Sequence, residues 1–394
     1  MDTGCNLNLS HLPKELKLLL EIIKKEDKEI QTISKDWFID IDWNKFLKLA
    51  LHHRMYAFIY TKMKNIDKQL IPSHVVQVLS TYFKRNTFHM LHLSGEMGKV
   101  SKLFAENQLR LLFLKGPILG VDLYGDISLR TSGDLDALVP IDDLEKVNEL
   151  LVKNGYVKEE DFPTVMNEWK WRRHHTTYMH PMSKVKLEIH WRLHPGPGKE
   201  PNFDELWGRK RISPITNYPV YFLGREDLLM FLVCHGARHG WSRLRWITDI
   251  DCIVRQEVNW EEFNVLLKKY QCKHLVGQAL ILSSQLLDTP ITEETRVLTS
   301  EKQLTQLAQL AIYYLESMIN LHTDPVPEEV SEYHERYLYS LKTIPQKLLF
   351  HLSWLYPYPQ DVETLPLPKQ LHVLYFPLRP VLWAWRKMRY HKEM

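Results

Sequence analysis

The chain has 394 residues, of which 44% are hydrophobic, so it is long enough for two or three domains and apolar enough to build buried cores. The chain has 51 Lys and Arg residues and 48 Asp and Glu residues, which give a net charge of +3. It therefore lacks the strongly basic charge of many nucleic-acid-binding proteins, and the charge gives no reason to favour nucleic acid as a partner. Four cysteines without a CxxC pair argue against a zinc knuckle or a disulfide framework and favour a reduced setting.

The sequence also lacks the marks of a secreted or membrane-spanning protein. Residues Met1 to Asn6 contain neither the basic region nor the apolar core of a signal peptide. No run of about 18 apolar residues is present to span a bilayer. We therefore predict a cytoplasmic protein without a transmembrane segment.

The first part of the chain, residues 1–107, is predicted to be helical. Apolar residues cluster at helical spacing near positions 20 and 50, and the stretch 73–107 contains no Pro and only two glycines, Gly95 and Gly98. That stretch is either two helices that meet at the glycines or one interrupted helix. We expect this helical region to pack against the segment that follows.

The next segment, residues 108–222, mixes predicted strands with helices. Apolar runs and turn residues predict strands over 109–115, 134–139 and, after an irregular insert, near 185–191, with helices over 117–124 and 142–154. Strands that alternate with helices of this length indicate an α/β or α+β fold.

Two acidic residues on one of these strands are the strongest functional signal. Asp134 and Asp136 are two positions apart, and successive strand side chains alternate between faces. Both carboxylates are therefore predicted to lie on one face, while Leu135 and Ala137 point into a core.

A third acid, Glu188, lies on the strand near 185–191, where strict alternation places it on the open face. If the two strands are neighbours, Glu188 joins Asp134 and Asp136. Three carboxylates offer the hard oxygen ligands that suit Mg²⁺, which is usually completed by water and substrate phosphates. Two such ions can clamp the attacking and leaving oxygens of a phosphoryl displacement.

Upstream of the acids, Lys115-Gly116-Pro117 ends a buried strand and opens a helix. A helix N-terminus offers unpaired N–H groups to a phosphate, and Lys115 adds a full charge. Arg130 is a second candidate phosphate ligand because its planar fork binds two oxygens at once. Alternatively, Lys115 is an exposed residue at the strand end, and Arg130 forms a structural ion pair with Asp126.

Several histidines lie close to the third acid. His190 shares the open face with Glu188, so it either orients a metal ligand, contacts substrate or is a surface histidine of a half-buried sheet. His174, His175 and His180 precede that strand, but their spacing is irregular and no cysteine lies near them. We therefore do not expect these three to form a metal site.

The last segment, residues 223–394, is predicted to be a helical domain that closes over the sheet. Its expected helices are Leu228–His239, Leu244–Val254, Trp260–Lys269 and Gly277–Leu287. Arg238 and His239 come at the end of the first of these helices, together with Arg243, and can face the phosphates of a nucleotide.

The tail, Leu371–Met394, combines aromatic with basic residues. This composition suits a membrane interface or a stacking platform for nucleic acid. A helix docked on the protein's own body is the commoner explanation of such a tail, and it is the one that we favour.

The order of these residues resembles a known family. The run Leu114-Lys115-Gly116, Arg130, Gly133-Asp134-Leu135-Asp136 and Glu188-Ile189-His190-Trp191 resembles the nucleotidyltransferase (polymerase β-like) fold, and more narrowly the uncharacterised bacterial nucleotidyltransferases that are sometimes found in gene clusters for modified peptides. The resemblance covers about residues 90–255. It implies an α+β fold with a mixed sheet and flanking helices, a metal-bound NTP, and transfer of a nucleotidyl group with release of pyrophosphate.

The resemblance also implies roles for individual residues. Asp134, Asp136 and Glu188 would hold Mg²⁺, or Mn²⁺ as an alternative, and take part in catalysis. The nucleotide would be bound by Lys115, Gly116, Arg130, Ser132 and Gly133, to which the helix end adds Arg238 and His239.

We expect ATP as the NTP and an acceptor hydroxyl on a small molecule, a peptide or a protein; nucleic acid is not favoured. The alternatives are a catalytically silent nucleotide-binding or scaffold protein of the same fold and an RNA-binding member.

Overall fold

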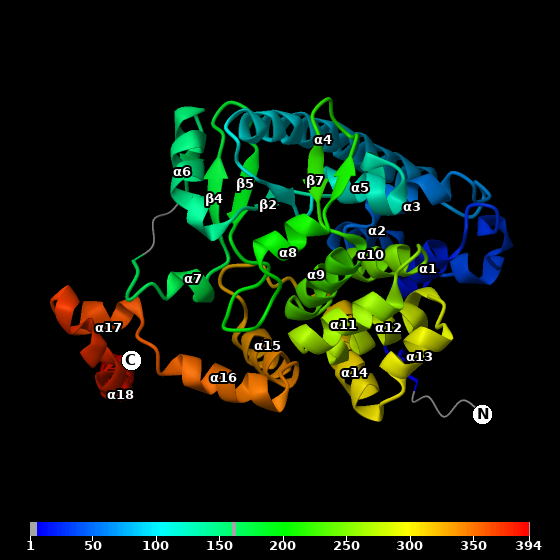
Figure 1. Cartoon of the computed structure of the whole chain (residues 1–394). Helices are drawn as coiled ribbons and strands as arrows, with labels where there is room; N and C mark the ends of the chain where they lie inside the picture. Colours follow the sequence, from blue (N-terminus) through cyan, green and yellow to red (C-terminus); the bar gives the residue numbers. More distant parts are fainter. Residues whose placement is uncertain (1–5, 160–162, 394) are drawn as a thin grey trace.

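The computed structural model describes residues 6–159 and 163–393. The chain begins with four helices joined by short 3₁₀ turns, η1 (Ile30–Thr32) and η2 (Lys35–Phe38). The helices are α1 (Lys14–Lys24), α2 (Trp43–His52), α3 (Tyr56–Met63) and α4 (Ser73–Glu106). Figure 1 shows α4 as the longest helix, running along one side of the sheet.

The stretch that sequence left open as one helix or two is the single 34-residue helix α4. Gly95 and Gly98 do not interrupt it, although each costs about 1 kcal/mol relative to Ala in a helix interior. Met90, Leu93 and Met97 on the same stretch are fully buried. Burial of these side chains outweighs the weak helix propensity of the two glycines.

A seven-stranded mixed sheet forms the middle of the molecule, in the order β3-β4-β5-β2-β1-β7-β6. β2 pairs with β5, and β1 with β7, in parallel; the other pairs are antiparallel. The strands are β1 (Leu112–Phe113), β2 (Leu135–Leu138), β3 (Val157–Lys158), β4 (His175–Met179), β5 (Lys186–His190), β6 (Arg211–Ser213) and β7 (Val220–Phe222). The expected α+β fold with a mixed sheet is confirmed.

Shorter elements connect and flank these strands. They are α5 (Pro117–Tyr124), η3 (Ile127–Leu129), η4 (Ile141–Asp143), α6 (Leu144–Lys153), α7 (Trp169–Arg172) and α8 (Phe203–Gly208). The strand predicted over 109–115 is reduced to two residues, and the insert before β5 contains β3 and β4, which the sequence did not reveal. Both differences arise because strand pairing with distant segments, rather than local pattern, defines such short strands.

The rest of the chain is helical, as predicted. Its helices are α9 (Arg225–Arg238), α10 (Leu244–Val254), α11 (Trp260–Tyr270), α12 (Lys273–Leu287), α13 (Glu293–Thr299), α14 (Lys302–Glu316), α15 (Glu328–Ser340), α16 (Ile344–Trp354), α17 (Pro359–Thr364) and α18 (Tyr375–Glu393), with a 3₁₀ turn, η5 (Lys369–Leu374), before the last. In Figure 1, α16 to α18 extend away from the main body.

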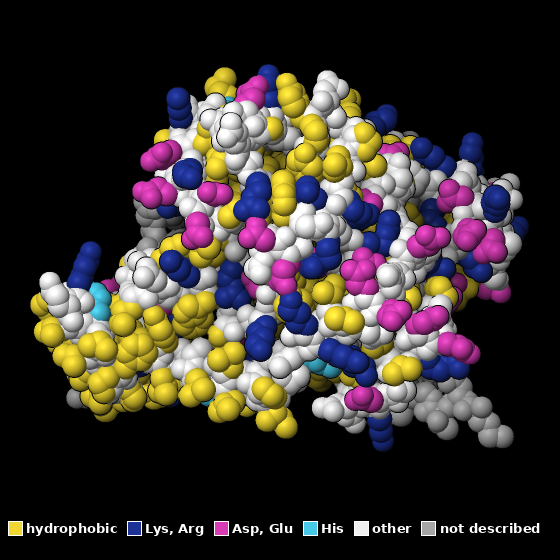
Figure 2. All heavy atoms as spheres, in the orientation of Figure 1, with side chains coloured by type: hydrophobic (Ala, Val, Ile, Leu, Met, Phe, Trp, Pro, Cys, Tyr) yellow, Lys and Arg dark blue, Asp and Glu magenta, His cyan; other side chains and the backbone are white. Residues whose placement is uncertain are grey.

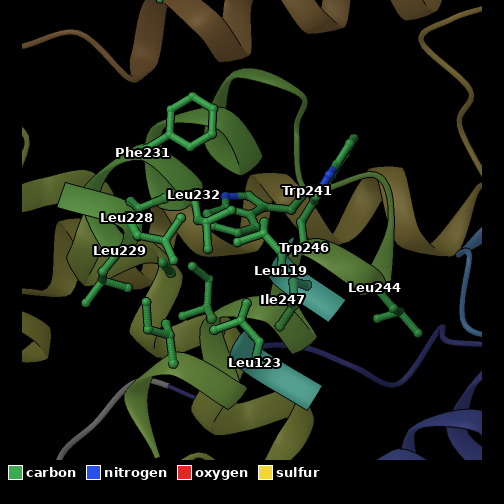
Figure 3. Close-up of a cluster of buried hydrophobic side chains, with 14 of the residues drawn as sticks. Leu119, Leu123, Leu228, Leu229, Phe231, Leu232, Trp241, Leu244, Trp246 and Ile247 are labelled. Atoms are coloured by element: carbon green, nitrogen blue, oxygen red, sulfur yellow. The ribbon is translucent and has the colours of Figure 1, made fainter. Parts of the chain in front are cut away.

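Buried side chains tie the C-terminal helices to the sheet layer. Figure 3 shows Leu119 and Leu123 of α5 near Ile247 of α10, with Leu228 of α9 in the same cluster. All four are buried. This packing holds α10, and through it α9, against α5, the helix that follows β1.

A hydrophobic cluster runs through all three predicted segments, from Leu7 to Leu341, and the boundaries predicted at 107/108 and 222/223 remain a prediction. Cys234, Cys252 and Cys272 are free thiols; Cys5, like the rest of the first five residues, lies outside the described part. Within residues 6–159 and 163–393, no helix combines the length and apolarity needed to cross a membrane.

Candidate active site

The parallel pairing of β2 with β5 brings the predicted acids together. Asp136 and Glu188 are direct register partners, and Leu135 and Leu187, one position earlier, are fully buried on the core side. Asp134 stands immediately before β2 and lines the same cavity as the other two carboxylates. The expectation that the two strands are neighbours is therefore correct.

The turn before α5 brings a lysine to these acids. Gly116 has a φ of +102°, a conformation that side-chain-bearing residues rarely adopt, and a Cβ there would lie 3.3 Å from Leu135 Cδ2. This turn directs Lys115 inward, and its Nζ lies 3.0 Å from Asp136 Oδ1. Lys115 is therefore not the exposed strand-end residue that was the alternative.

His190 is part of the acidic cluster. Its Nε2 lies 3.2 Å from Asp136 Oδ1 and 3.6 Å from Glu188 Oε2, and the residue is only 3% exposed. The surface-histidine alternative is therefore wrong. Ligand atoms of Asp136, Glu188 and His190 lie within 4.8 Å of one another, close enough to bind one metal ion.

Two buried atoms of this cluster have no hydrogen-bond partner within the described residues: Asp136 Oδ2 and His190 Nδ1. Buried polar atoms in folded proteins are almost always paired, so unpaired ones call for a ligand, an ion or a water. The donor set of two carboxylates and an imidazole fits a divalent cation.

Two of the three histidines before β5 lie beside His190. Ligand atoms of His174, His175 and His190 also lie within 4.8 Å of one another, with His175 Nδ1 3.2 Å from His174 Nε2. The reason is the antiparallel pairing of β4 with β5, which sets His175 directly opposite His190. His180 is not in this group and accepts a hydrogen bond from the Ser183 N–H.

The charges in the cluster depend strongly on one another. Burial and the adjacent Asp136 raise the pKa of Asp134 to about 6. Burial also disfavours the charged form of Asp136, but Lys115 and His190 outweigh it and hold the pKa of that carboxyl well below its usual range. Conversely, hydrogen bonds to Asp136 and Glu188 overcome burial and raise the pKa of His190.

Arg130, a predicted nucleotide ligand, is buried in an ion pair with an acid of a distant helix. Its guanidinium is 1% exposed and holds Asp249 of α10 through two bonds, Nε to Oδ1 at 3.0 Å and Nη2 to Oδ2 at 2.9 Å. The ion-pair alternative was correct in kind but named the wrong partner, because Asp126 accepts from Ser128 N–H and Oγ–H instead.

A cavity of about 1060 Å³ lies above the acids, between the sheet, α4, α9 and α10. The predicted residues Ser132, Gly133, Arg238 and His239 line it, as does Arg130. Gly116 is not among the lining residues, but its positive φ allows the turn that directs Lys115 into the cavity. Eight lining residues are Lys or Arg, against three acids: Arg54, Arg85, Lys115, Arg130, Lys186, Arg238, Arg243 and Arg245.

Sequence reasoning missed three of these cations. Arg54 follows α2, Arg85 lies in α4, and Arg245 lies in α10. Arg245 also donates to Thr131 Oγ1 at 2.9 Å, which anchors the loop that leads to Asp134. No local pattern distinguishes these residues from ordinary surface arginines, because they meet only through the packing of distant helices.

The arrangement can bind an anionic ligand together with a cation. A field of eight positive side chains attracts a polyphosphate, and the acids at its floor supply hard oxygen ligands for a divalent ion. Tyr56, Tyr82 and Trp246 add apolar or stacking surface to the cavity wall.

The chain is similar to one protein family and, distantly, to proteins of known structure. A family model for uncharacterised nucleotidyltransferases matches residues 40–288. An antigenic nucleotidyltransferase-like protein from Paracoccidioides brasiliensis is 15% identical, with a TM-score of 0.32, over 53% of this chain and 97% of that one. MenT4, a nucleotidyltransferase toxin from Mycobacterium tuberculosis H37Rv, is 12% identical, with a TM-score of 0.28, over 67% and 99%.

No curated protein matches the chain. The family match nevertheless spans well over half of the sequence and contains every residue of the acidic cluster. The chain therefore belongs to the family of uncharacterised nucleotidyltransferases.

Proposed function

We propose that the protein is an Mg²⁺-dependent nucleotidyltransferase that transfers a nucleotidyl group from ATP to an acceptor hydroxyl. The observation that carries this proposal is the register pairing of Asp136 with Glu188 at the floor of a cavity lined by eight Lys and Arg residues. A metal-bound triphosphate needs acids and cations in one place, and this cavity offers both.

Each group has a role in the proposal. Asp134, Asp136 and Glu188 would hold the metal ion, with Mn²⁺ as an alternative to Mg²⁺. When bound, that ion neutralises phosphate charge and lowers the pKa of the attacking hydroxyl. Lys115 would exchange its present contact with Asp136 for a phosphate oxygen, and Arg238 faces the cavity from the end of α9.

The reaction balances without a further reactant. The acceptor oxygen forms a bond to the α-phosphorus, and the bond from that phosphorus to the oxygen bridging it to the β-phosphorus breaks. Pyrophosphate leaves with that electron pair, and the proton of the acceptor passes to the Glu188 carboxylate. Arg130 supports the site from behind, because its bidentate pair with Asp249 fixes α10 to the loop before β2.

The acceptor would be a small molecule, a peptide or a protein side chain. The net charge of +3 gives no special support to RNA as the acceptor. ATP is the first NTP to test, since the cavity's phosphate-binding residues do not themselves select a base.

The test is transfer of label from each α-labelled NTP, with Mg²⁺ or Mn²⁺, to components of a cell extract. Asp134→Asn combined with Asp136→Asn should abolish labelling while thermal unfolding stays cooperative, because metal ligands are lost and hydrophobic contacts are kept. The matched control is Asp142→Asn with Asp143→Asn, an acidic pair that lies outside the cavity lining.

Full labelling by the Asp134/Asp136 variant would refute the assignment of the metal site. A wild-type protein that binds ATP but labels no acceptor with either ion would instead support the catalytically silent nucleotide-binding alternative.

A further inference from the structure

The last part of the chain, residues 343–389, is an ordered unit that we call the C-terminal arm. It has a small core of its own, in which Tyr375 and Leu382 pack with Val165 apart from the main hydrophobic cluster. Asp361 is fully buried and ion-paired with both Arg379 and Arg386, at 2.8 Å and 2.7 Å. These contacts fix which side chains of the arm face outward.

The outward face of the arm is strongly apolar. Figure 2 shows hydrophobic side chains gathered over α16 to α18, whereas charged side chains are scattered over the rest of that view. The most exposed are Ile344 at 84%, Val381 at 64% and Met388 at 62%, and Trp383 and Trp385 are each 39% exposed. Soluble monomers rarely expose so large a contiguous apolar surface unless it binds something.

The sequence of the arm is also basic. Residues 343–389 hold six Lys and Arg against two Asp and Glu; removing these from the totals of 51 and 48 leaves 45 against 46. The arm thus has a net charge of +4 and the rest of the chain a net charge of −1, so the arm accounts for the positive net charge of the protein. Lys369, Lys387 and Arg389 are exposed beside the apolar face, and Glu363 is the one exposed acid between residues 343 and 389.

We propose that the C-terminal arm binds the surface of a membrane that contains anionic phospholipid. Apolar and tryptophan side chains beside lysine and arginine are the composition of helices that lie in the lipid interface, where the apolar face enters the acyl boundary and the cations meet lipid phosphates. This function is separate from the proposed nucleotidyl transfer, since the arm lies apart from the cavity.

The chemistry of the arm favours lipid over other occupants. The aliphatic side chains of Ile344, Val381 and Met388 are more exposed than the two tryptophan rings, so the surface that protrudes most suits acyl chains rather than nucleobase stacking. If two copies of the arm met face to face around a two-fold axis, Lys387 and Arg389 of one copy would lie against the same cations of the other. Repulsion between these like charges opposes such a dimer.

The experiment is flotation of the full-length protein with vesicles of phosphatidylcholine alone or with about one third phosphatidylglycerol. We expect binding to the anionic vesicles, at least about tenfold weaker binding to the neutral ones, and a decrease as salt rises from about 0.1 M to about 0.5 M. Lipids brominated in the acyl chain should quench part of the tryptophan fluorescence, because Trp383 and Trp385 enter the interface.

The sequence offers a closely matched pair of variants. Ile344→Ser, Val381→Ser and Met388→Ser together should reduce binding by about tenfold or more. The control replaces the same three residue types at similar exposure on the body of the protein, Ile212→Ser (62%), Val297→Ser (64%) and Met182→Ser (87%), and should bind like wild type.

Equal loss in both variants, or no binding of wild type to anionic vesicles, would overturn the proposal. So would a dimer in solution, measured by light scattering, that the arm variant alone abolishes, or binding of the arm to single-stranded oligonucleotide in place of vesicles. ATP binding should be the same in both triple variants, so failure of the membrane proposal is distinguishable from failure of the proposed enzyme.

Discussion

Substitution of Glu188 best distinguishes an active enzyme from a nucleotide-binding protein without activity. The Glu188 carboxylate lies opposite Asp136 and 3.6 Å from His190, so it can both bind a metal ion and accept a proton. Hydrogen bonding to His190 overcomes the effect of burial and lowers the pKa of Glu188, which keeps the carboxylate charged at neutral pH.

We predict that Glu188→Gln leaves ATP binding in Mg²⁺ largely intact but reduces turnover by about 10²–10⁴-fold, the range typical of lost acid–base function. Binding is measured by calorimetry and turnover by label transfer. The control is Glu149→Gln, which removes an exposed carboxylate of α6 that lies outside the cavity lining. Equal turnover of the Glu188 variant and wild type would remove this residue from the mechanism.

Lys115 is the residue that we expect to contribute most directly to phosphate binding. If it moves from Asp136 to a phosphate when nucleotide binds, Lys115→Ala should weaken ATP binding by about 1.5–3 kcal/mol, as expected for hydrogen bonds between charged groups. Lys153→Ala, on the exposed side of α6, is the control and should bind normally. Unchanged affinity of the Lys115 variant would mean that the phosphates lie elsewhere in the cavity.

At the scale of elements, the junction of α9 with α10 positions Arg238 and Arg245 over the acids. The chain turns there because Trp241, fully buried, packs against α9 at Gly236. A Cβ at Gly236 would lie 2.7 Å from Trp241 Cε3, nearer than real Cβ contacts come. The glycine is therefore required for packing, although glycine is a poor helix former.

We predict that Gly236→Ala destabilises the protein by about 1–3 kcal/mol, the range for overpacked cores. Gly95→Ala should have the opposite effect, because a Cβ there has nothing within 4 Å and alanine is favoured in a helix interior by roughly 0.5–1 kcal/mol. Denaturant unfolding measures both. Destabilisation by both substitutions would show that helix geometry, rather than contact with Trp241, decides the outcome.

At the scale of the whole molecule, many histidines are buried in the neutral form. Burial lowers the pKa of His53, His194 and His235 well below the usual value of 6.5, with help from nearby positive groups. In the unfolded chain these rings bind a proton near pH 6.5, whereas in the folded chain they do not. Protonation therefore favours the unfolded state as the pH falls below about 6.5.

We predict that the free energy of unfolding decreases between about pH 7.5 and about pH 5.5, with a contribution approaching 1.4 kcal/mol per pH unit for each such histidine. His190 and Asp134, whose pKa values are raised, bind protons more readily in the folded chain and so stabilise it as the pH falls. These two groups are outnumbered by the buried neutral histidines. His53→Asn, which keeps an acceptor for Leu244 N–H, should make the pH dependence shallower in urea titrations. An identical slope in this variant would contradict the assignment.

Local sequence pattern is enough to predict several features of this protein. Strand alternation and spacing identified Asp134, Asp136 and Glu188, because a period of two places every second side chain on one face. Pro117 and the apolar stripes predict α5, α9 and α10 within a few residues of their observed bounds. This is possible because helix starts and helical periodicity depend on residues that are close together in the sequence.

Other features depend on which separate segments meet in the folded chain. The pairing of β4 with β5 brings His175 to His190, and the packing of α10 against the sheet layer gives Arg130 the partner Asp249. Arg54, in the turn after α2, and Arg85, in α4, reach the same cavity. The pair His175 and His190 is 15 positions apart, and the pair Arg130 and Asp249 is 119 positions apart. The free energy that selects such contacts comes from burial of the whole core, which no local window of sequence contains.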